Sequence, residues 1–219
     1  MNKALPGNPP FGDPLRRGVC LVIAAPSGTG KSTITRALLA NEPELSLSIS
    51  ATTRPPRPGE QDGVHYHFRT PAAFDAMVAD GAMLEHAHNF GRSYGSPRAP
   101  VERALAAGRD VVFDIDWQGV RQLRVALPAD VVGVFILPPS LDALERRLRN
   151  RGGDSEDEIA RRMASARDEL AHWAEFDHVV VNRDLDVAVM DVKGCLHAAR
   201  CATARQPGLP SFVASLAGL

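Results

Sequence analysis

The sequence predicts an α/β fold in which helices cover both faces of a parallel central sheet. Short apolar runs alternate with helical patterns along most of the chain. The run Val131 to Leu137 reads VVGVFIL, which is typical of a strand buried on both faces. Further strands are expected at Val19 to Ala24 and at Asp110 to Asp114, and a helix is expected at Ser32 to Ala40.

Residues that cap helices mark the later elements. Ser140 precedes a helical pattern, and Ser155 with Glu158 forms the capping box S-x-x-E before another. Asp184 is expected to open the last helix, and the tail after Gln206 is weakly specified.

The composition is that of an ordinary globular protein. The 219 residues are 44% hydrophobic and 23% charged, with a formal net charge of −1. This balance excludes a fully disordered chain and a basic protein that coats nucleic acid. No apolar run is long enough to cross a bilayer, and the Pro-rich start has no apolar signal core. We therefore expect a cytoplasmic protein, and we expect its three cysteines to be reduced thiols.

Residues 51 to 100 interrupt the α/β alternation. The run TTRPPRPGEQDG is too rich in Pro, Gly and charge for a core element, and the strand-like YHF, a helix from Pro71 and the turn-rich FGRSYGSP follow. An inserted lobe is the simplest explanation. The expected segments are a flexible arm (1–17), core (18–49), the lobe (50–100), core (101–146), a lid with its following helix (147–174), core (175–204) and a tail (205–219).

A phosphate-binding loop is predicted where APSGTGKST follows the first strand and opens a helix. Gly28 and Gly30 would let backbone N–H groups turn toward phosphate oxygens, and the helix dipole adds positive charge. Lys31 would contact the β- and γ-phosphates, and the Ser32 hydroxyl would bind Mg²⁺. The predicted ATP-binding residues are Ala25, Pro26, Ser27, Gly28, Thr29, Gly30, Lys31, Ser32 and Thr33.

This loop predicts a nucleoside triphosphate ligand but no particular reaction. GTPases, ATP-driven regulators and small-molecule kinases all share it. Ala25 stands where the motif usually has its first glycine.

The lobe adds residues suited to a second anion. Arg54 and Arg57 lie three residues apart on a Pro-stiffened turn, which suits recognition of a second phosphate, although a solvated basic turn would look the same. Glu85, taken alone, is most simply a surface carboxylate.

These motifs together resemble the guanylate kinase family. The run TTRPPRPGEQDGVHYHF at Thr52 to Phe68 is similar to that family's GMP-binding signature, and APSGTGKST, YGS, DIDWQG and RLRNRG fall in family order. The resemblance implies a P-loop three-layer sandwich with a parallel central sheet, an inserted GMP-binding lobe and a short helical lid. It implies that Arg54, Arg57, Tyr66 and Tyr94 hold the GMP phosphate and that Ser50, Glu85, Ser96 and Asp116 face guanine.

The chemistry of guanine agrees with the position of Glu85. Guanine presents N–H donors at N1 and at its 2-amino group, so a carboxylate can accept from both, whereas the N1 lone pair of adenine repels it. Pro97 and Pro100 lie where a helix should begin after YGS. Pro97 suits a first helical position, whereas Pro100 would shift the start of the helix.

Asp114 and Asp116 end an apolar run, at the sheet edge where ligands of open α/β sheets bind. We expect Asp114 to bind Mg²⁺ or its waters beside Ser32, with a helix cap as the alternative for Asp114. By resemblance, Arg147, Arg151 and Arg162 are lid residues that act on the transferred phosphoryl group.

The expected reaction is ATP + GMP to ADP + GDP with Mg²⁺. No general base is needed, because the attacking phosphate oxygen is already largely ionised at neutral pH. The alternatives are a kinase for a sugar phosphate or another nucleotide, which should lack the pair Ser50 and Glu85, and a guanylate-kinase-like binding module, which typically lacks the loop lysine. We expect ATP and GMP as the partners, with no nucleic acid and no membrane, and the oligomeric state stays open.

Overall fold

The computed structural model describes residues 16–89, 91–150 and 155–218. Its main sheet has five parallel strands in the order β2-β7-β1-β8-β9. The strands are β1 (Cys20–Ala24), β2 (Leu45–Leu47), β7 (Asp110–Phe113), β8 (Val131–Leu137) and β9 (His178–Val181). The predicted α/β class with a parallel central sheet is therefore confirmed. Each parallel connection carries the chain back across the sheet, so the strands end at the same edge.

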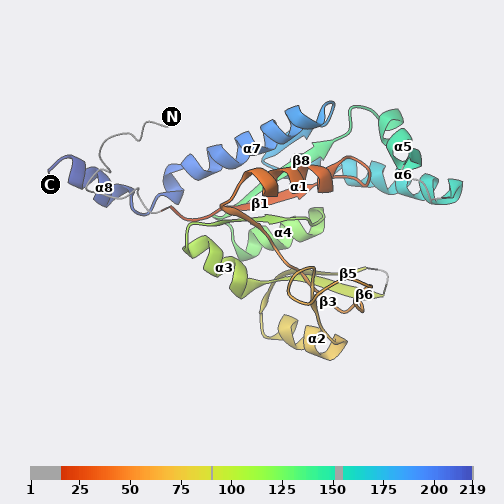
Figure 1. Cartoon of the computed structure of the whole chain (residues 1–219), viewed down its shortest axis with the longest axis horizontal. Coiled ribbons are helices and arrows are strands. Elements are labelled where there is room, and N and C mark those ends of the chain that lie inside the picture. The colour runs from red at the N-terminus through yellow and green to blue at the C-terminus, as the bar shows by residue number, and fades with distance from the viewer. Residues whose placement is uncertain (1–15, 90, 151–154, 219) are drawn as a thin grey trace.

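Helices cover both faces of this sheet, as Figure 1 shows. On one face lie α1 (Lys31–Asn41) and α7 (Leu185–Cys201), which bury Leu38 and Val192 against the strands. On the other face lie α3 (Arg98–Ala106) and α4 (Trp117–Ala126), which bury Leu105 and Leu123. Every residue of β1 is buried, as expected for a central strand.

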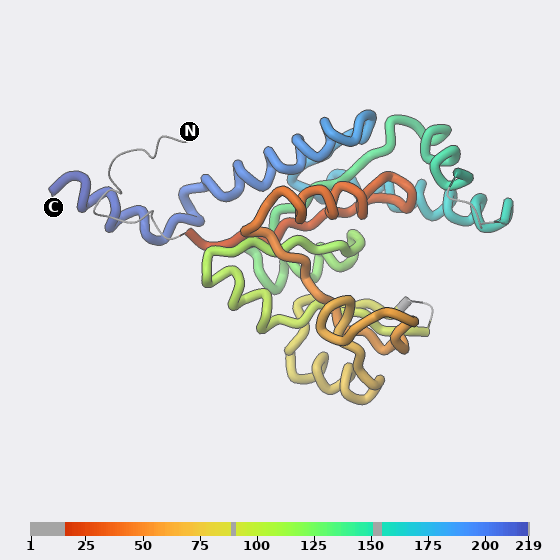
Figure 2. Tube along the Cα trace, in the orientation of Figure 1, coloured from red at the N-terminus to blue at the C-terminus, as the bar shows by residue number. Residues whose placement is uncertain are grey.

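A second, smaller sheet comes from the stretch that interrupts the α/β alternation. It contains β3 (Ala51–Thr52), β4 (His67–Phe68), β5 (Met83–Asn89) and β6 (Arg92–Pro97), in the order β4-β3-β6-β5. The helix α2 (Pro71–Ala79) is capped by Thr70 and buries Phe74 against this sheet. Figure 2 shows the chain leaving the core after β2 and returning through α3, so that this sheet and α2 form a lobe below the core.

Two further helices form an arm beyond the edge where the strands end. They are α5 (Leu141–Asn150) and α6 (Glu156–Leu170), followed by the short helix η1 (Trp173–Glu175). Both predicted caps are confirmed: the Ser140 hydroxyl accepts from Ala143 N at 3.1 Å, and Ser155 and Glu158 form the reciprocal capping box. Leu148 and Met163 belong to a small apolar cluster that joins the two helices.

The sequence predictions differ from the structure mainly at helix ends. The helix expected from Ser32 begins at Lys31, and α3 begins at Arg98 with Pro100 in its first turn, where proline removes no intrahelical hydrogen bond. After Gln206 the structure has α8 (Leu209–Leu216), which follows η2 (Thr203–Arg205). The sequence analysis did not predict α8, whose start has no side-chain cap.

Some predictions fall outside the described residues. Of the arm predicted for residues 1–17, only Arg16 and Arg17 are described, and the predicted lid residue Arg151 also lies outside the described residues. Among the helices of the described ranges, none is long and apolar enough to span a membrane.

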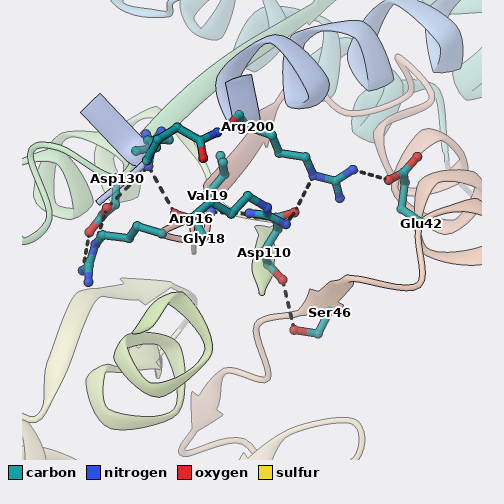
Figure 3. A network of polar contacts seen from close by, with 11 residues as sticks. Arg16, Gly18, Val19, Glu42, Ser46, Asp110, Asp130 and Arg200 are labelled. Carbon is teal, nitrogen blue, oxygen red and sulfur yellow. Dashed lines mark hydrogen bonds and ion pairs between the residues drawn. The ribbon is translucent and has the colours of Figure 1, made fainter. Parts of the chain in front are cut away.

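A buried ionic network lies at the edge of the main sheet where the strands begin (Figure 3). The carboxylate of Asp110 is fully buried and accepts from Arg16, Arg200 and the backbone N–H of Val19. Arg200 also donates to Glu42 at 2.7 Å, so it links α7 to the end of α1. The network therefore supports the fold from the side opposite the phosphate-binding loop.

Candidate active site

The phosphate-binding loop lies between β1 and α1, as the motif predicts. Gly28 (φ 91°) and Gly30 (φ 103°) are both left-handed, a conformation that L-residues with side chains adopt only at a cost. A Cβ atom at Gly30 would lie 2.5 Å from Nδ2 of Asn182, and one at Gly28 would lie 2.9 Å from Cδ2 of Leu148. Both glycines are thus required by backbone geometry and by close packing.

Two side chains from other elements brace this loop. The carbonyl oxygen of Thr29 accepts from Asn182 Nδ2 at 2.7 Å and from Arg147 Nη1 at 3.2 Å. Arg147 also donates to the carbonyl oxygen of Asn182 at 3.1 Å. The sequence did not single out Asn182, although its place directly after the apolar run Val179 to Val181 was an available signal. Arg147 contacts loop backbone here, and its role in transfer stays a prediction.

Lys31 at the start of α1 forms an ion pair with Asp114. Asp114 follows β7 and shares with Ser32 a cavity of about 350 Å³, which we call the inner cavity. The two predicted metal ligands therefore face the same space, and their hydroxyl and carboxylate oxygens are donors that Mg²⁺ prefers. The helix-cap alternative belongs instead to Asp116, whose Oδ1 accepts from Gly119 N at 3.0 Å at the start of α4.

A second cavity, the loop cavity, has a volume of about 270 Å³ and lies directly on the phosphate-binding loop. Glu169 near the end of α6 and Asp116 complete its lining. Burial raises the pKa of Glu169, while the Ser165 hydroxyl and the charge of Lys31 act against that rise. The sequence did not predict Glu169 as a site residue, since one carboxylate on a helix carries no signal of what it faces.

Glu85 lies inside the lobe, opposite Ser96 in the pairing of β5 with β6. Ser96 is fully buried and Glu85 is only 5% exposed, so the default reading of Glu85 as a surface carboxylate is wrong. The Ser96 hydroxyl donates to Glu85 Oε1 at 2.6 Å. Burial raises the pKa of Glu85, the Ser96 hydrogen bond opposes this, and the charge of Asp116 adds to it.

The carboxylate of Glu85 faces a third cavity of about 440 Å³, the lobe cavity. Of the predicted GMP-binding residues, it is lined by Ser50, Tyr66, Glu85, Tyr94 and Asp116. Lys31 and Asp114 line it from the core side. The structure thus brings five of the predicted residues to one space.

The predicted phosphate-binding arginines lie on the turn after β3. The Arg54 guanidinium lies 5.2 Å from the Tyr66 ring centroid and donates to Glu60 Oε1 at 2.8 Å. Glu60 Oε2 accepts from the backbone N–H of Arg57 at 2.7 Å. The hydrogen bond from Arg54, and then that from the Arg57 backbone, lowers the pKa of Glu60 to about 2. Glu60, which sequence reasoning did not select, therefore holds the Arg54 guanidinium and the backbone of the turn at Arg57.

Of the two remaining predicted lid arginines, the structure describes Arg162 but not Arg151. Arg162 is half-buried on α6 and borders a hollow with Glu158, Arg161 and Ser165. It is absent from the lining of the loop cavity within the described part of the chain. Arg151 lies outside the described residues.

The strand, glycine loop, lysine and helix define the class of P-loop phosphate-binding proteins. Comparison with known proteins specifies the family. The guanylate kinase family model matches residues 17–199. Guanylate kinase from Gluconobacter oxydans is 64% identical over 200 residues, covering 91% of this chain and 96% of the relative. The enzyme from Granulibacter bethesdensis is 62% identical over 201 residues, covering 92% and 94%.

A solved structure gives the same result. Guanylate kinase from Anaplasma phagocytophilum superposes with a TM-score of 0.75 at 32% sequence identity, covering 94% of this chain and 98% of that one. The chain belongs to the guanylate kinase family.

Proposed function

We propose that this guanylate kinase transfers the γ-phosphoryl group of ATP, bound on the phosphate-binding loop, to GMP bound in the lobe cavity. The family assigns the overall activity, that of an ATP:GMP phosphotransferase. The observation that carries the proposed geometry is that Lys31 and Asp116 line both the loop cavity and the lobe cavity. Two nucleotides in these cavities would meet beside the Lys31 ammonium group.

On the donor side, residues 25 to 33 would hold the ATP phosphates through backbone N–H groups and the positive end of α1. Lys31 would exchange its partner Asp114 for the phosphates, because an ammonium group binds the more highly charged anion more strongly. Ser32 and Asp114 would then hold Mg²⁺. When bound, this ion supplies positive charge that offsets the charge developing on the phosphate oxygens.

On the acceptor side, Glu85 would accept from N1–H and the 2-amino group of guanine. Ser96 would position the carboxylate through its 2.6 Å hydrogen bond, with Ser50 and Asp116 beside the base. Arg54, Arg57, Tyr66 and Tyr94 would bind the GMP phosphate. Because Glu60 already orients Arg54, little conformational entropy is lost when the phosphate binds.

The transfer itself needs alignment and charge neutralisation rather than a base. A GMP phosphate oxygen attacks the γ-phosphorus in line, the bond to the β-bridging oxygen breaks, and ADP leaves. Lys31 stabilises the charge of the transition state, with lid arginines Arg147, Arg151 and Arg162 as the further proposed cations. Exclusion of water by the lid would prevent hydrolysis of ATP.

The test is ADP release by the full chain with ATP, Mg²⁺ and one acceptor at a time. GMP should support turnover, and AMP, UMP, dTMP and the absence of an acceptor should give at most background rates. Equal rates with AMP and GMP would contradict the role of Glu85, and ADP release without any acceptor would indicate an ATPase.

A further inference from the structure

The helix α4 lies between the core sheet and the lobe, and it is attached to the lobe by its side chains (Figure 1). The Gln122 amide forms two hydrogen bonds with the backbone of His86 on β5, accepting at 3.0 Å and donating at 2.9 Å. Near the start of the helix, a Cβ atom at Gly119 would lie 3.2 Å from Glu85 Oε2. The strand that carries the proposed guanine-binding carboxylate is therefore fixed against α4.

The same helix is attached to the segment that follows α6. The Trp117 indole stacks on the His172 imidazole, with ring centroids 3.6 Å apart and planes inclined by 12°. His172 Nδ1 lies 2.6 Å from Glu175 Oε1. Arg121 donates two hydrogen bonds of 2.7 Å to Glu175, and its guanidinium carbon lies 4.5 Å from the Trp117 ring centroid. We call these four residues the joint.

The joint connects two parts of the site without lining a cavity itself. None of its residues is among the described residues that line the loop cavity or the lobe cavity. His172 lies two residues after the end of α6. The helix α6 itself carries Glu169, which lines the loop cavity. Trp117 follows Asp116 directly, and Asp116 lines both cavities.

We propose that α4 and the joint couple nucleotide binding in the loop cavity to GMP binding in the lobe cavity, with Trp117 and His172 as positioning residues. This inference rests on the proposed assignment of ATP and GMP to the two cavities. A movement of β5 toward bound GMP carries α4 with it, because the Gln122 hydrogen bonds and the close contact of Gly119 with Glu85 join the two elements directly. Through the joint, α4 then shifts α6 relative to the phosphate-binding loop, and by linkage the effect is reciprocal.

The experiment compares the Kd of GMP, measured by calorimetry, with and without a saturating non-hydrolysable ATP analogue and Mg²⁺. The wild-type chain should show coupling of about fivefold or more. His172→Ala removes the stacked ring that is the joint residue nearest to α6, and Gln122→Ala removes both side-chain hydrogen bonds to β5. The contacts of Arg121 with Glu175 and of Arg124 with Asp177 remain in both variants, so each should weaken the link and lower the coupling factor at least about twofold. The Kd of each nucleotide alone should stay within about threefold of wild type in both variants, because neither residue is among the described residues that line the loop cavity or the lobe cavity.

Trp173→Phe is the matched control. Trp173 is the neighbour of His172 but is 53% exposed and lies outside the joint, so this variant should keep the coupling and the turnover of wild type. It also leaves Trp117 as the sole tryptophan, since the sequence has two. Binding of the ATP analogue should change Trp117 emission in Trp173→Phe and leave it unchanged once His172→Ala is added.

Unchanged coupling in both variants, or no coupling in wild type, would overturn the proposed role of the joint. Loss of the separate affinities in both variants would also overturn it, because that result indicates a purely structural role. A wild-type chain that binds neither nucleotide would refute the proposed function instead, so the two failures can be told apart.

Discussion

Ser96 and Glu85 face each other across β6 and β5, and the buried Ser96 hydroxyl donates to the buried Glu85 carboxylate at 2.6 Å. The hydrogen bond satisfies one oxygen, and the other carboxylate oxygen, Oε2, lies near Gly119 at the start of α4. This pairing explains how a carboxylate can be kept buried, and it would orient Glu85 for the base in the proposed function.

Glu85→Gln should weaken both GMP use and discrimination against AMP. The amide keeps the size of the side chain but places an N–H donor against the donors of guanine, so kcat/KM for GMP should fall about 10- to 100-fold. The comparison of initial rates with GMP and AMP measures this effect. Glu102→Gln, at an exposed position of α3, is the control. An unchanged GMP/AMP ratio in Glu85→Gln would refute the guanine role.

The raised pKa of Glu85 predicts a pH dependence of GMP binding. Guanine requires the ionised carboxylate, so GMP affinity should fall as the pH drops through the raised pKa, beyond the loss caused by protonation of the GMP phosphate near pH ~6. The Glu85→Gln variant retains only the phosphate effect. Calorimetric Kd values from pH 5 to 8 for both chains isolate the Glu85 contribution, and parallel profiles would contradict it.

The raised pKa of Glu85 also predicts how the stability of the fold depends on pH, and here the protonated carboxyl is the favoured form. A folded-state pKa above the unfolded value contributes stability that is present at low pH and is lost as the pH rises through the folded pKa. Glu85→Gln should therefore unfold at a higher temperature than wild type at pH 7, and this gain should shrink toward pH 4. A variant less stable than wild type at both pH values would show that the Ser96 hydrogen bond outweighs desolvation.

The sequence was sufficient where a local pattern determines the structure. VVGVFIL predicted β8 to the residue, and Ser155 with Glu158 predicted the start of α6, because burial and capping act over a few neighbours. It did not predict Asn182, Glu60 or Glu169, whose partners Thr29, Arg54 and the loop cavity are brought together by tertiary packing. The burial of Glu85 likewise depends on α4, which comes more than thirty residues later.

Lys31→Ala should abolish most turnover while leaving GMP binding largely intact. Lys31 lines both the loop cavity and the lobe cavity. If it acts on the transferred phosphoryl group as proposed, its removal should lower kcat about 10³-fold. Single-turnover kinetics and GMP calorimetry separate the two effects. Lys193→Ala removes a lysine paired with Glu42 at the far end of α1 and should keep normal kcat. A normal kcat in Lys31→Ala would contradict the assignment of the loop.

Glu60→Ala should raise the KM for GMP about 3- to 10-fold with little change in kcat, because in the proposed site the phosphate would then have to order the Arg54 side chain and the turn at Arg57 itself. Loss of a negative charge near the phosphate acts in the opposite direction, so Glu60→Gln is needed beside it. The amide oxygen of Gln can still accept from Arg54, and this variant should have a KM nearer to wild type. If both variants bound GMP more tightly than wild type, repulsion rather than positioning would be the role of Glu60.

Glu42→Gln should destabilise the fold in a pH-dependent manner. Burial alone would raise the pKa of Glu42, but hydrogen bonds from Lys193, Arg200 and His197 lower it to about 2. A folded-state pKa below the unfolded value gives stability that is present above the unfolded pKa and lost as the pH falls through the folded one. The variant should therefore lose about 1–3 kcal/mol at pH 7, and the difference from wild type should decline between about pH 4.5 and pH 2.

Denaturant unfolding of the two chains at a series of pH values measures that difference. GMP and ATP turnover at 25 °C should stay near wild type, because Glu42 lies at the end of α1 opposite the phosphate-binding loop. Asp110→Asn is the companion variant in the same network, and it should cost more than Glu42→Gln because Asp110 is fully buried and accepts from two arginines. A Glu42→Gln penalty that did not change with pH would show that packing, rather than the charge, provides the stabilisation.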